Sequence, residues 1–233
     1  MLCDATSAVF SQKLDWEKLD AVSFSWQKVL GGEGGHGVVV LSPNAIKRLS
    51  TFHPERPMPK IFRLVKNGKL IEGVYEGETL NTPSMFCVAD ALDSLMWIKE
   101  IGGLTETIRR SNENFKCLQG WVDKTPWIEN LVSDPRNRSN TSVCLKFSDE
   151  RFISLIPEEK TRFVKEFVGL LEVENAAFDI KGHRNAPPGL RIWCGATINL
   201  DDIQKLLPWL EYCFHEIISL SLIHISEPTR LRS

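Results

Sequence analysis

The stretch Ser25-Trp26-Gln27-Lys28-Val29-Leu30-Gly31-Gly32-Glu33-Gly34-Gly35-His36-Gly37 connects two segments that have the composition of β-strands. Residues 20–25 before it and 37–41 after it are rich in Val and Phe and are bounded by polar residues or glycine, which is typical of strands. The stretch therefore holds Lys28 at a strand end beside a glycine-rich loop. Proteins present an amine to a flat, phosphorylated aldehyde cofactor in this way.

Two other interpretations of the stretch fail on context. Gly32, Gly34 and Gly37 match G-x-G-x-x-G, but a dinucleotide-binding fingerprint follows a strand and opens a helix, whereas this one precedes a strand. Ser25 and Lys28 match the S-x-x-K motif of penicillin-interacting serine enzymes, but no S-D-N or K-T-G accompanies them. Taken alone, Lys28 would be interpreted as a solvated surface lysine.

The composition is that of an ordinary globular protein. The chain has 233 residues, of which 42% are hydrophobic and 25% charged, with a net charge of -2, so it shows no basic excess of the kind that general nucleic-acid or membrane-surface binding requires. The six cysteines are scattered without CxxC or Cys/His spacing, which predicts reduced thiols, no metal site and a cytoplasmic protein. We expect no export signal and no membrane span.

The pattern of apolar residues predicts an α/β chain in which a smaller α+β unit with an antiparallel sheet forms the last third. Residues 50–80 are punctuated by proline and glycine, which marks a candidate active-site or subunit-contact loop. A helix from about 104 to 122 is expected to bridge two domains. The other expected strands are 141–147, 177–180 and 190–194, and the other expected helices are 43–49, 82–101, 157–172 and 200–215.

Asp4 supplies a second element of the same chemistry. Pyridoxal phosphate (PLP) needs a lysine, a carboxylate against its pyridine nitrogen and donors around its phosphate. Asp4 lies on a candidate strand that precedes the strand of Lys28, so both side chains could reach one crevice at the ends of the sheet.

Three motifs carry a resemblance to a known family. Residues Cys3–Ala8 read Cys-Asp-Ala-Thr-Ser-Ala, Ser25–Glu33 read Ser-Trp-Gln-Lys-Val-Leu-Gly-Gly-Glu, and Glu76–Met85 read Glu-Gly-Glu-Thr-Leu-Asn-Thr-Pro-Ser-Met. Over about residues 1–218 the chain resembles the phosphoserine aminotransferases, which are class V, fold-type I PLP enzymes. The resemblance implies a partial large domain in residues 1–103 and a bridging helix with a small α+β domain in 104–219. From their own sequence, residues 220–233 are expected to be a non-native tail.

The resemblance also implies the roles of individual residues. Lys28 would hold PLP covalently and move the proton at the substrate Cα, Asp4 would pair with the pyridinium nitrogen, and Gln27 would bind the cofactor phosphate. Asn81 and Thr82 would reach the cofactor phosphate of the other subunit of a homodimer, and Thr82 is expected to open a helix whose N-terminal amides favour an anion. The alternative for Asn81 and Thr82 is a plain helix cap.

A basic turn supplies the expected substrate site. His183, Arg184 and Arg191 bracket the Pro187-Pro188-Gly189 turn, and such groups suit phosphate and carboxylate. In the family, the matching His and Arg bind the substrate phosphate and the later Arg clamps the α-carboxylate. The spacing from His183 to Arg191 is one residue longer than in the family branch that the motifs resemble. The alternative is a surface turn whose cations pair with Asp179 or Glu174.

The resemblance implies amino transfer between L-glutamate and 3-phosphohydroxypyruvate, giving O-phospho-L-serine and 2-oxoglutarate for serine biosynthesis. Fold and cofactor alone leave other class V enzymes open, such as an alanine-glyoxylate-type transaminase or a desulfurase, and also an inactive fragment. Relatives begin with more chain that completes the site, so we expect this chain by itself to be inactive. The histidines His36 and His53 are interpreted as structural, and Trp26 is the tryptophan nearest the chemistry.

Overall fold

The computed structural model describes residues 1–52 and 54–226, with residues 220–226 described as backbone only. The chain divides into two compact units, one formed by Met1–Thr105 and one that begins at Glu106. His53 and residues 227–233 lie outside the described residues, so the interpretation of His53 and of half of the expected tail is untested.

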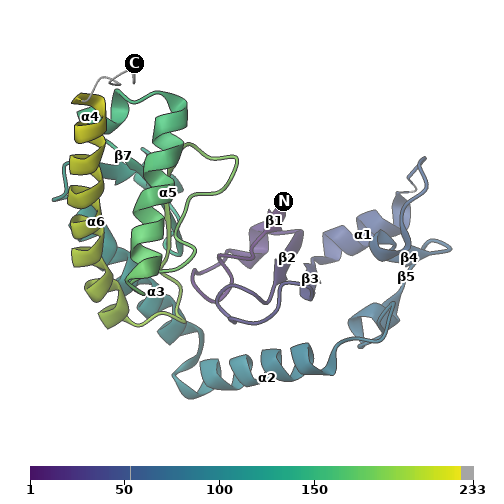
Figure 1. Ribbon diagram of the computed structural model, residues 1–233. Helices are drawn as coiled ribbons and strands as arrows, with labels where there is room; N and C mark the ends of the chain where they lie inside the picture. Colours follow the sequence, from purple (N-terminus) through teal and green to yellow (C-terminus); the bar gives the residue numbers. More distant parts are fainter. Residues whose placement is uncertain (53, 227–233) are drawn as a thin grey trace. The chain divides into compact units, whose positions relative to one another are not determined.

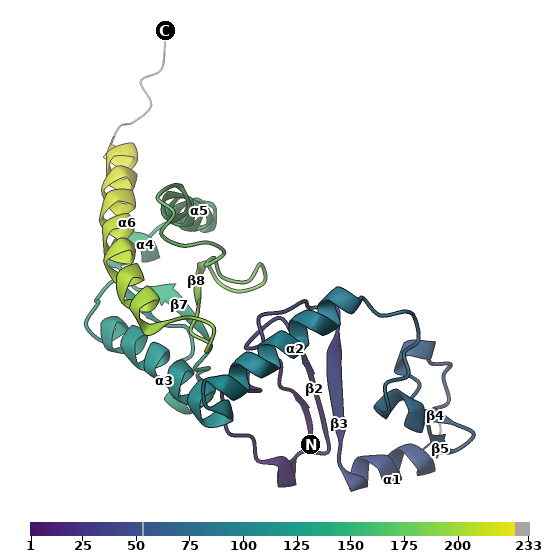
Figure 2. The same ribbon diagram turned by 90° about the horizontal axis from the view of Figure 1, so that it is seen from below.

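The first unit is built on a mixed sheet of three strands in the order β1-β2-β3. Strand β1 (Leu2–Asp4) pairs in parallel with β2 (Ala21–Ser25), and β2 pairs antiparallel with β3 (Gly37–Leu41). Figure 2 shows β2 and β3 side by side in this unit. The register places Asp4 opposite Ser23, so the carboxyl ends of β1 and β2 lie at the same edge of the sheet.

Helix α1 (Pro43–Thr51) follows β3 directly. It begins where the sequence predicts, because the Ser42 hydroxyl accepts a hydrogen bond from the Ala45 amide at 3.1 Å and Pro43 occupies the first helical turn. The expected irregular segment that follows contains a small hairpin of β4 (Val65–Lys66) and β5 (Lys69–Leu70). Asn67 and Gly68 form its turn with φ of 52° and 75°, values that Asn-Gly turns favour.

Helix α2 (Met85–Glu100) begins later than expected. The prediction that Thr82 opens this helix is wrong: Ser84 is the N-cap, and its hydroxyl accepts from the Cys87 amide at 3.4 Å. The hydroxyl of Ser84 binds one of the free amides of the first helical turn, so the helix starts after Ser84. Gly102 and Gly103, with φ of 117° and 74°, separate α2 from α3 (Gly103–Val122), as the sequence predicts.

The second unit contains an antiparallel sheet in the order β6-β7-β8, which confirms the predicted α+β character. Its strands are β6 (Ile128–Asn130), β7 (Ser142–Phe147) and β8 (Gly189–Trp193). The expected strand at 177–180 is absent from the described fold, and a single bridge joins Lys181 to Leu190 there. Asp179 interrupts this segment with a φ of 53°, which a strand does not accommodate.

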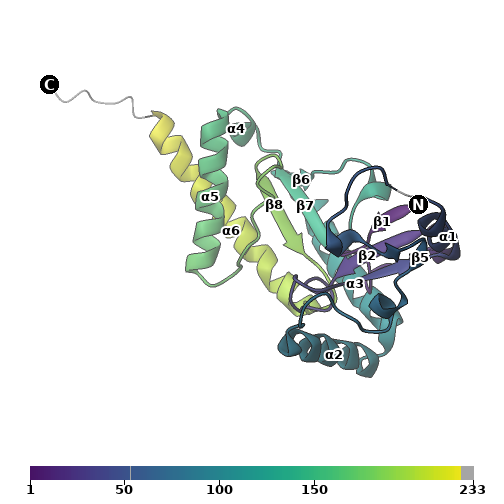
Figure 3. The same ribbon diagram turned by 90° about the vertical axis from the view of Figure 1, so that its right-hand side faces the viewer.

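Helices complete the second unit, and α5 (Pro157–Val173) and α6 (Leu200–Ser226) lie side by side in Figures 1 and 3. A short helix α4 (Glu150–Ile153), which the sequence analysis did not predict, precedes α5. The short 3-10 helices of the chain are Trp16–Lys18, Lys60–Phe62, Glu72–Tyr75 and Pro135–Asn137. No helix in residues 1–52 and 54–226 combines the length and apolar character that a membrane crossing needs.

The core of the second unit follows from strand alternation. Val143, Leu145 and Phe147 of β7 are buried, whereas the residues between them are not. Trp127 stacks on Phe214 of α6 with ring centroids 4.1 Å apart and an interplanar angle of 4°. Aromatic contacts of this kind join the sheet to the helices and make this unit the better packed of the two.

Candidate active site

Lys28 lies in the loop that joins β2 to β3, and its side chain is half-buried. The loop folds back on itself, because the Gly31 amide donates to the Lys28 carbonyl at 3.0 Å and the Gly32 amide donates to the Trp26 carbonyl at 2.9 Å. Next to Lys28 in the chain, Val29 is buried. The backbone on both sides of the lysine is therefore held by the protein.

Glycine is required at particular points of this loop. Gly31 has a φ of 68°, a conformation that other residues rarely adopt. A Cβ at Gly32 would stand 2.8 Å from Oδ2 of Asp90 in α2, and one at Gly37 would stand 2.8 Å from the Phe24 carbonyl oxygen. The glycine-rich sequence thus allows the loop to pack closely against α2 and against β2.

Asp4 ends β1, at the sheet edge beyond which the chain of β2 continues to Lys28. Its Oδ1 accepts hydrogen bonds from the Thr6 hydroxyl at 2.6 Å and the Thr6 amide at 3.0 Å. These two bonds hold the pKa of the Asp4 carboxyl below its ordinary value, so Asp4 is ionised near neutral pH. Within the described residues both bonds fall on Oδ1, which leaves Oδ2 for a further donor.

Gln27 precedes Lys28 and is exposed. Its Oε1 accepts a hydrogen bond from the Ser25 hydroxyl. A Cβ at Gly34 would stand 3.5 Å from Nε2 of Gln27, so this side chain folds back over the glycine loop. Since Ser25 bonds the amide oxygen, the amide NH₂ group remains a donor for an anion.

Asn81 and Thr82 are exposed and lie in the segment before α2. Because α2 begins only at Met85, its free N-terminal amides follow Ser84 rather than Thr82. Any anion contact that Asn81 and Thr82 make must therefore come from their side chains or from the backbone of an extended segment. Neither the helix opening nor the plain helix cap considered for Thr82 is found.

The second unit holds the expected substrate residues on one hairpin-like turn. The Gly182 amide donates to the Gly189 carbonyl at 2.9 Å, and the Arg191 amide donates to the Ile180 carbonyl at 2.7 Å. These bonds bring the segment of His183 and Arg184 back toward β8, which carries Arg191. The Gly182 position is tight, since a Cβ there would stand 3.0 Å from the Gly189 oxygen.

The side chains of this turn differ in their partners. Nδ1 of His183 accepts a hydrogen bond from the Asn185 amide at 3.2 Å, which directs the other ring nitrogen to act as the donor. His183 and Arg184 are exposed. Nη2 of Arg191 lies 3.7 Å from Oδ2 of Asp179, so the ion pair that the sequence analysis offered as the alternative is present. At this distance and exposure the pair is one that a ligand carboxylate can displace.

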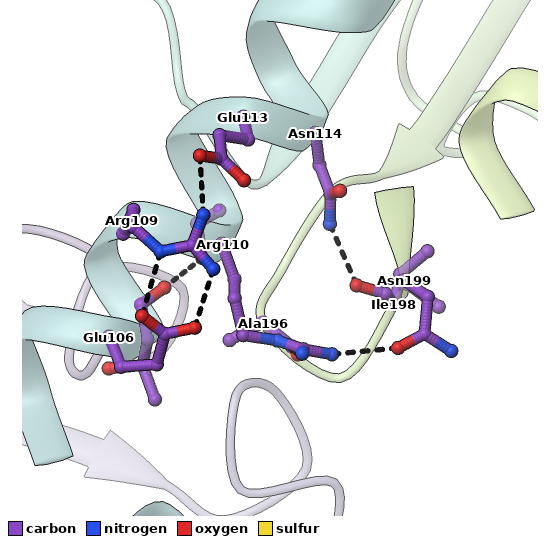
Figure 4. Close-up of polar contacts among 10 residues, drawn as sticks. Glu106, Arg109, Arg110, Glu113, Asn114, Ala196, Ile198 and Asn199 are labelled. Carbon is purple, nitrogen blue, oxygen red and sulfur yellow. Dashed lines mark hydrogen bonds and ion pairs between the residues drawn. The ribbon is translucent and has the colours of Figure 1, made fainter. Parts of the chain in front are cut away.

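A polar cluster on α3 supports the end of β8, as Figure 4 shows. Arg110 donates from Nε to the Ala196 carbonyl at 2.9 Å and from Nη2 to Oδ1 of Asn199 at 2.9 Å. The buried Asn114 donates to the Ile198 carbonyl at 2.9 Å. The segment that continues β8 is therefore fixed to α3.

Sequence reasoning missed two contacts around the candidate site. Thr6 orders Asp4, and the spacing of a threonine two residues after an aspartate is a turn signal that could have revealed it. The rings of Trp26 and His36 stack with centroids 5.2 Å apart and an interplanar angle of 11°. Because Ser25 pairs with Gly37, Trp26 and His36 become neighbours at the loop entrance, which the periodicity of the sequence does not show.

A lysine loop at the carboxyl edge of adjacent parallel strands, joined in sequence to an α+β unit, is the arrangement of fold-type I PLP enzymes. A profile of the aminotransferase class-V family matches residues 1–156. The chain belongs to the aminotransferase class-V family, as the motifs predicted, and has its fold.

Within this family, the chain is similar to several phosphoserine aminotransferases. The chain is 48% identical over 213 residues to the phosphoserine aminotransferase of Methanosarcina mazei, which covers 91% of this chain and 55% of that protein. The phosphoserine aminotransferase from Bacillus circulans subsp. alkalophilus superposes with a TM-score of 0.69 at 21% identity, over 92% of this chain and 53% of that one. A PLP-bound phosphoserine aminotransferase from Trichomonas vaginalis superposes with a TM-score of 0.68 at 21% identity, over 90% and 53%. The chain thus spans about half the length of these relatives.

Proposed function

We propose that the complete gene product binds PLP on Lys28 and transfers an amino group between L-glutamate and 3-phosphohydroxypyruvate, forming O-phospho-L-serine and 2-oxoglutarate. The observation that carries this proposal is the position of Asp4 and Lys28 at one edge of two parallel strands. The identity of 48% to the Methanosarcina mazei phosphoserine aminotransferase supports the choice of reaction.

The residues of the first unit fit PLP. An ionised Asp4 with a free Oδ2 suits the protonated nitrogen of a pyridine ring. The exposed amide of Gln27, next in the chain to Lys28, suits a phosphate oxygen. PLP, when bound, supplies an electron sink that stabilises negative charge at the substrate Cα.

The chain's own groups then divide the remaining work. Lys28 holds the cofactor and, when released, its Nζ takes and returns the proton at the substrate Cα. The loop contacts of Gly31 and Gly32 restrict the backbone from which that amine extends. Such restriction matters because catalysis by a positioned base falls steeply with misplacement.

His183 and Arg184 are proposed to bind the substrate phosphate, and Arg191 the α-carboxylate. A planar guanidinium on a β-strand suits a carboxylate, which it can bind with two parallel hydrogen bonds. A histidine and an arginine on an exposed turn suit a phosphate dianion. In this arrangement residues 104–219 act as the bridging helix and small domain, and residues 1–103 as part of the cofactor-binding domain.

A second copy of the chain is proposed to complete the site. Asn81 and Thr82 are exposed and make no hydrogen bond to the described residues, so their polar atoms remain for a group outside the chain. We assign them to the cofactor phosphate of the partner subunit in a homodimer.

The test uses the complete gene product, purified with PLP. We expect a visible absorbance band from covalently bound cofactor and amino transfer from glutamate to 3-phosphohydroxypyruvate. Lys28→Ala removes the band and lowers kcat by at least about 10²-fold, since it removes the catalytic base, whereas Lys13→Ala leaves both unchanged. Persistence of the band in Lys28→Ala contradicts the assignment of Lys28. Faster turnover with glyoxylate than with 3-phosphohydroxypyruvate contradicts the assignment of the substrate.

A further inference from the structure

The two aromatic rings at the entrance of the Lys28 loop form a stacked pair. The centroids of Trp26 and His36 lie 5.2 Å apart and the rings are within 11° of parallel. Ser25 and Gly37 are the last paired residues of β2 and β3, so Trp26 and His36 occupy the next position on each side. The stack therefore joins the two ends of the loop at the point where backbone pairing stops.

The stack is connected to the backbone of the lysine. The carbonyl of Trp26 accepts the Gly32 amide at 2.9 Å, and the carbonyl of Lys28 accepts the Gly31 amide at 3.0 Å. Trp26 thus contacts His36 through its ring and the inside of the loop through its backbone. A change in the stack reaches Lys28 through two consecutive residues of chain.

The imidazole acts in this pair through its ring face. Nδ1 of His36 is buried and has no hydrogen-bond partner among the described residues. A histidine that was held in place by hydrogen bonds would have a partner for this nitrogen, because buried polar groups normally have partners. The ring of His36 contacts the described chain through its stack on Trp26.

We propose that Trp26 and His36 form a clamp that positions Lys28 by closing its loop, with the His36 ring as a positioning residue. This inference rests on the proposed function of Lys28. It goes beyond that function, because it assigns both residues an action through the loop rather than a part in the chemistry. The clamp predicts that any flat aromatic ring at position 36 preserves the position of the lysine, and that loss of the ring does not.

The experiment compares His36→Phe, which keeps a ring, with His36→Ala, which removes it, in the complete gene product. His215→Ala is the matched control, because His215 is an exposed histidine on α6. The first measurement is hydrogen exchange at the amides of Gly31 and Gly32 in protein freed of cofactor. We expect at least about tenfold faster exchange in His36→Ala, and rates within about twofold of the parent in His36→Phe and His215→Ala.

The second measurement uses protein loaded with PLP. We expect His36→Ala to shift the pH midpoint of the visible cofactor band and to lower kcat by about tenfold to 10²-fold with little change in KM. Adding Trp26→Leu to His36→Ala should cost little more, because both substitutions remove one contact. Normal rates in His36→Ala, or equal damage in His36→Phe, overturn the clamp. Failure of the parent protein to bind PLP overturns the proposed function instead, and the exchange measurement still decides on the clamp.

Discussion

Arg191 lies 3.7 Å from Asp179, measured from Nη2 to Oδ2. The two side chains differ in environment: that of Arg191 is 32% exposed, and that of Asp179 is 92% exposed. An exposed carboxylate at this distance holds a guanidinium only weakly. Under the proposed role of Arg191, Asp179 and the carboxylate of a substrate compete for the same guanidinium.

Asp179→Asn is expected to lower the KM for the carboxylate substrates, by at most about fivefold, because exposed ion pairs contribute little. Asparagine tolerates the φ of 53° at this position, so the backbone is retained. Steady-state kinetics at low and high salt measure the effect. Asp201→Asn, which removes an exposed ion pair with Lys205, is the control. An increase in KM would show that Asp179 assists binding.

Glu211→Gln is expected to destabilise the chain. One carboxylate oxygen of Glu211 accepts from Trp121 Nε1 at 2.9 Å and Thr125 Oγ1 at 3.3 Å, and the other accepts from Trp127 Nε1 at 2.9 Å. Glutamine places an NH₂ group against an indole N–H, so one donor loses its acceptor. We expect the free energy of unfolding to fall by about 1 to 3 kcal/mol. Urea unfolding measures this, and the exposed Glu216→Gln on the same helix should change nothing.

Asn114→Asp is expected to be more damaging than Asn114→Ala. The side chain of Asn114 is buried and donates to the carbonyls of Cys194, Gly195 and Ile198 at 3.3, 3.4 and 2.9 Å. Alanine leaves these acceptors unpaired, at a cost of about 1 to 3 kcal/mol, whereas aspartate adds a buried charge facing oxygen atoms and costs more. Thermal unfolding ranks the variants. Equal effects of the two, or an equal effect of the exposed Asn112→Ala, would contradict this account.

Thr6→Val is expected to raise the pKa of Asp4 toward its ordinary value, because the Thr6 hydroxyl is the main cause of the lowered pKa. A carboxyl whose folded pKa is lowered stabilises the fold above its unfolded pKa of about 3.9. That contribution is lost as pH falls through the folded pKa. Carboxyl ¹³C NMR titration measures the pKa of Asp4 in the parent and in Thr6→Val. Thr51→Val is the control, because among the described residues the Thr51 hydroxyl donates to the Lys47 carbonyl and to no carboxylate. An unchanged Asp4 pKa would show that the Thr6 amide suffices.

Local signals explain what the sequence predicted well. The strands around the glycine run, the helix after Pro43 and the glycine break between α2 and α3 each depend on residues within one turn or one hairpin. The motifs around Asp4, Lys28 and Asn81 are local too, and they predicted the family that the profile match shows. These motifs consist of particular residues at fixed spacing, so they can be recognised from the sequence alone.

Errors arose where two local signals competed or where the partner was distant. Thr82 and Ser84 are both residue types that cap helices, and it is the hydroxyl of Ser84 that binds a free amide of the first helical turn. Residues 177–180 are apolar enough for a strand, but the left-handed Asp179 ends regular pairing there.

The sequence by itself determined the glycine loop of Lys28 with its two flanking strands, the long helices and the family of the chain. Only the tertiary structure decided that His36 stacks on Trp26, that Glu211 receives two indoles and that Asp179 reaches Arg191. The physical reason is that periodicity and motifs report the conformation of neighbouring residues. Contacts between side chains depend on strand register and helix packing, which place residues together without any fixed spacing in the chain.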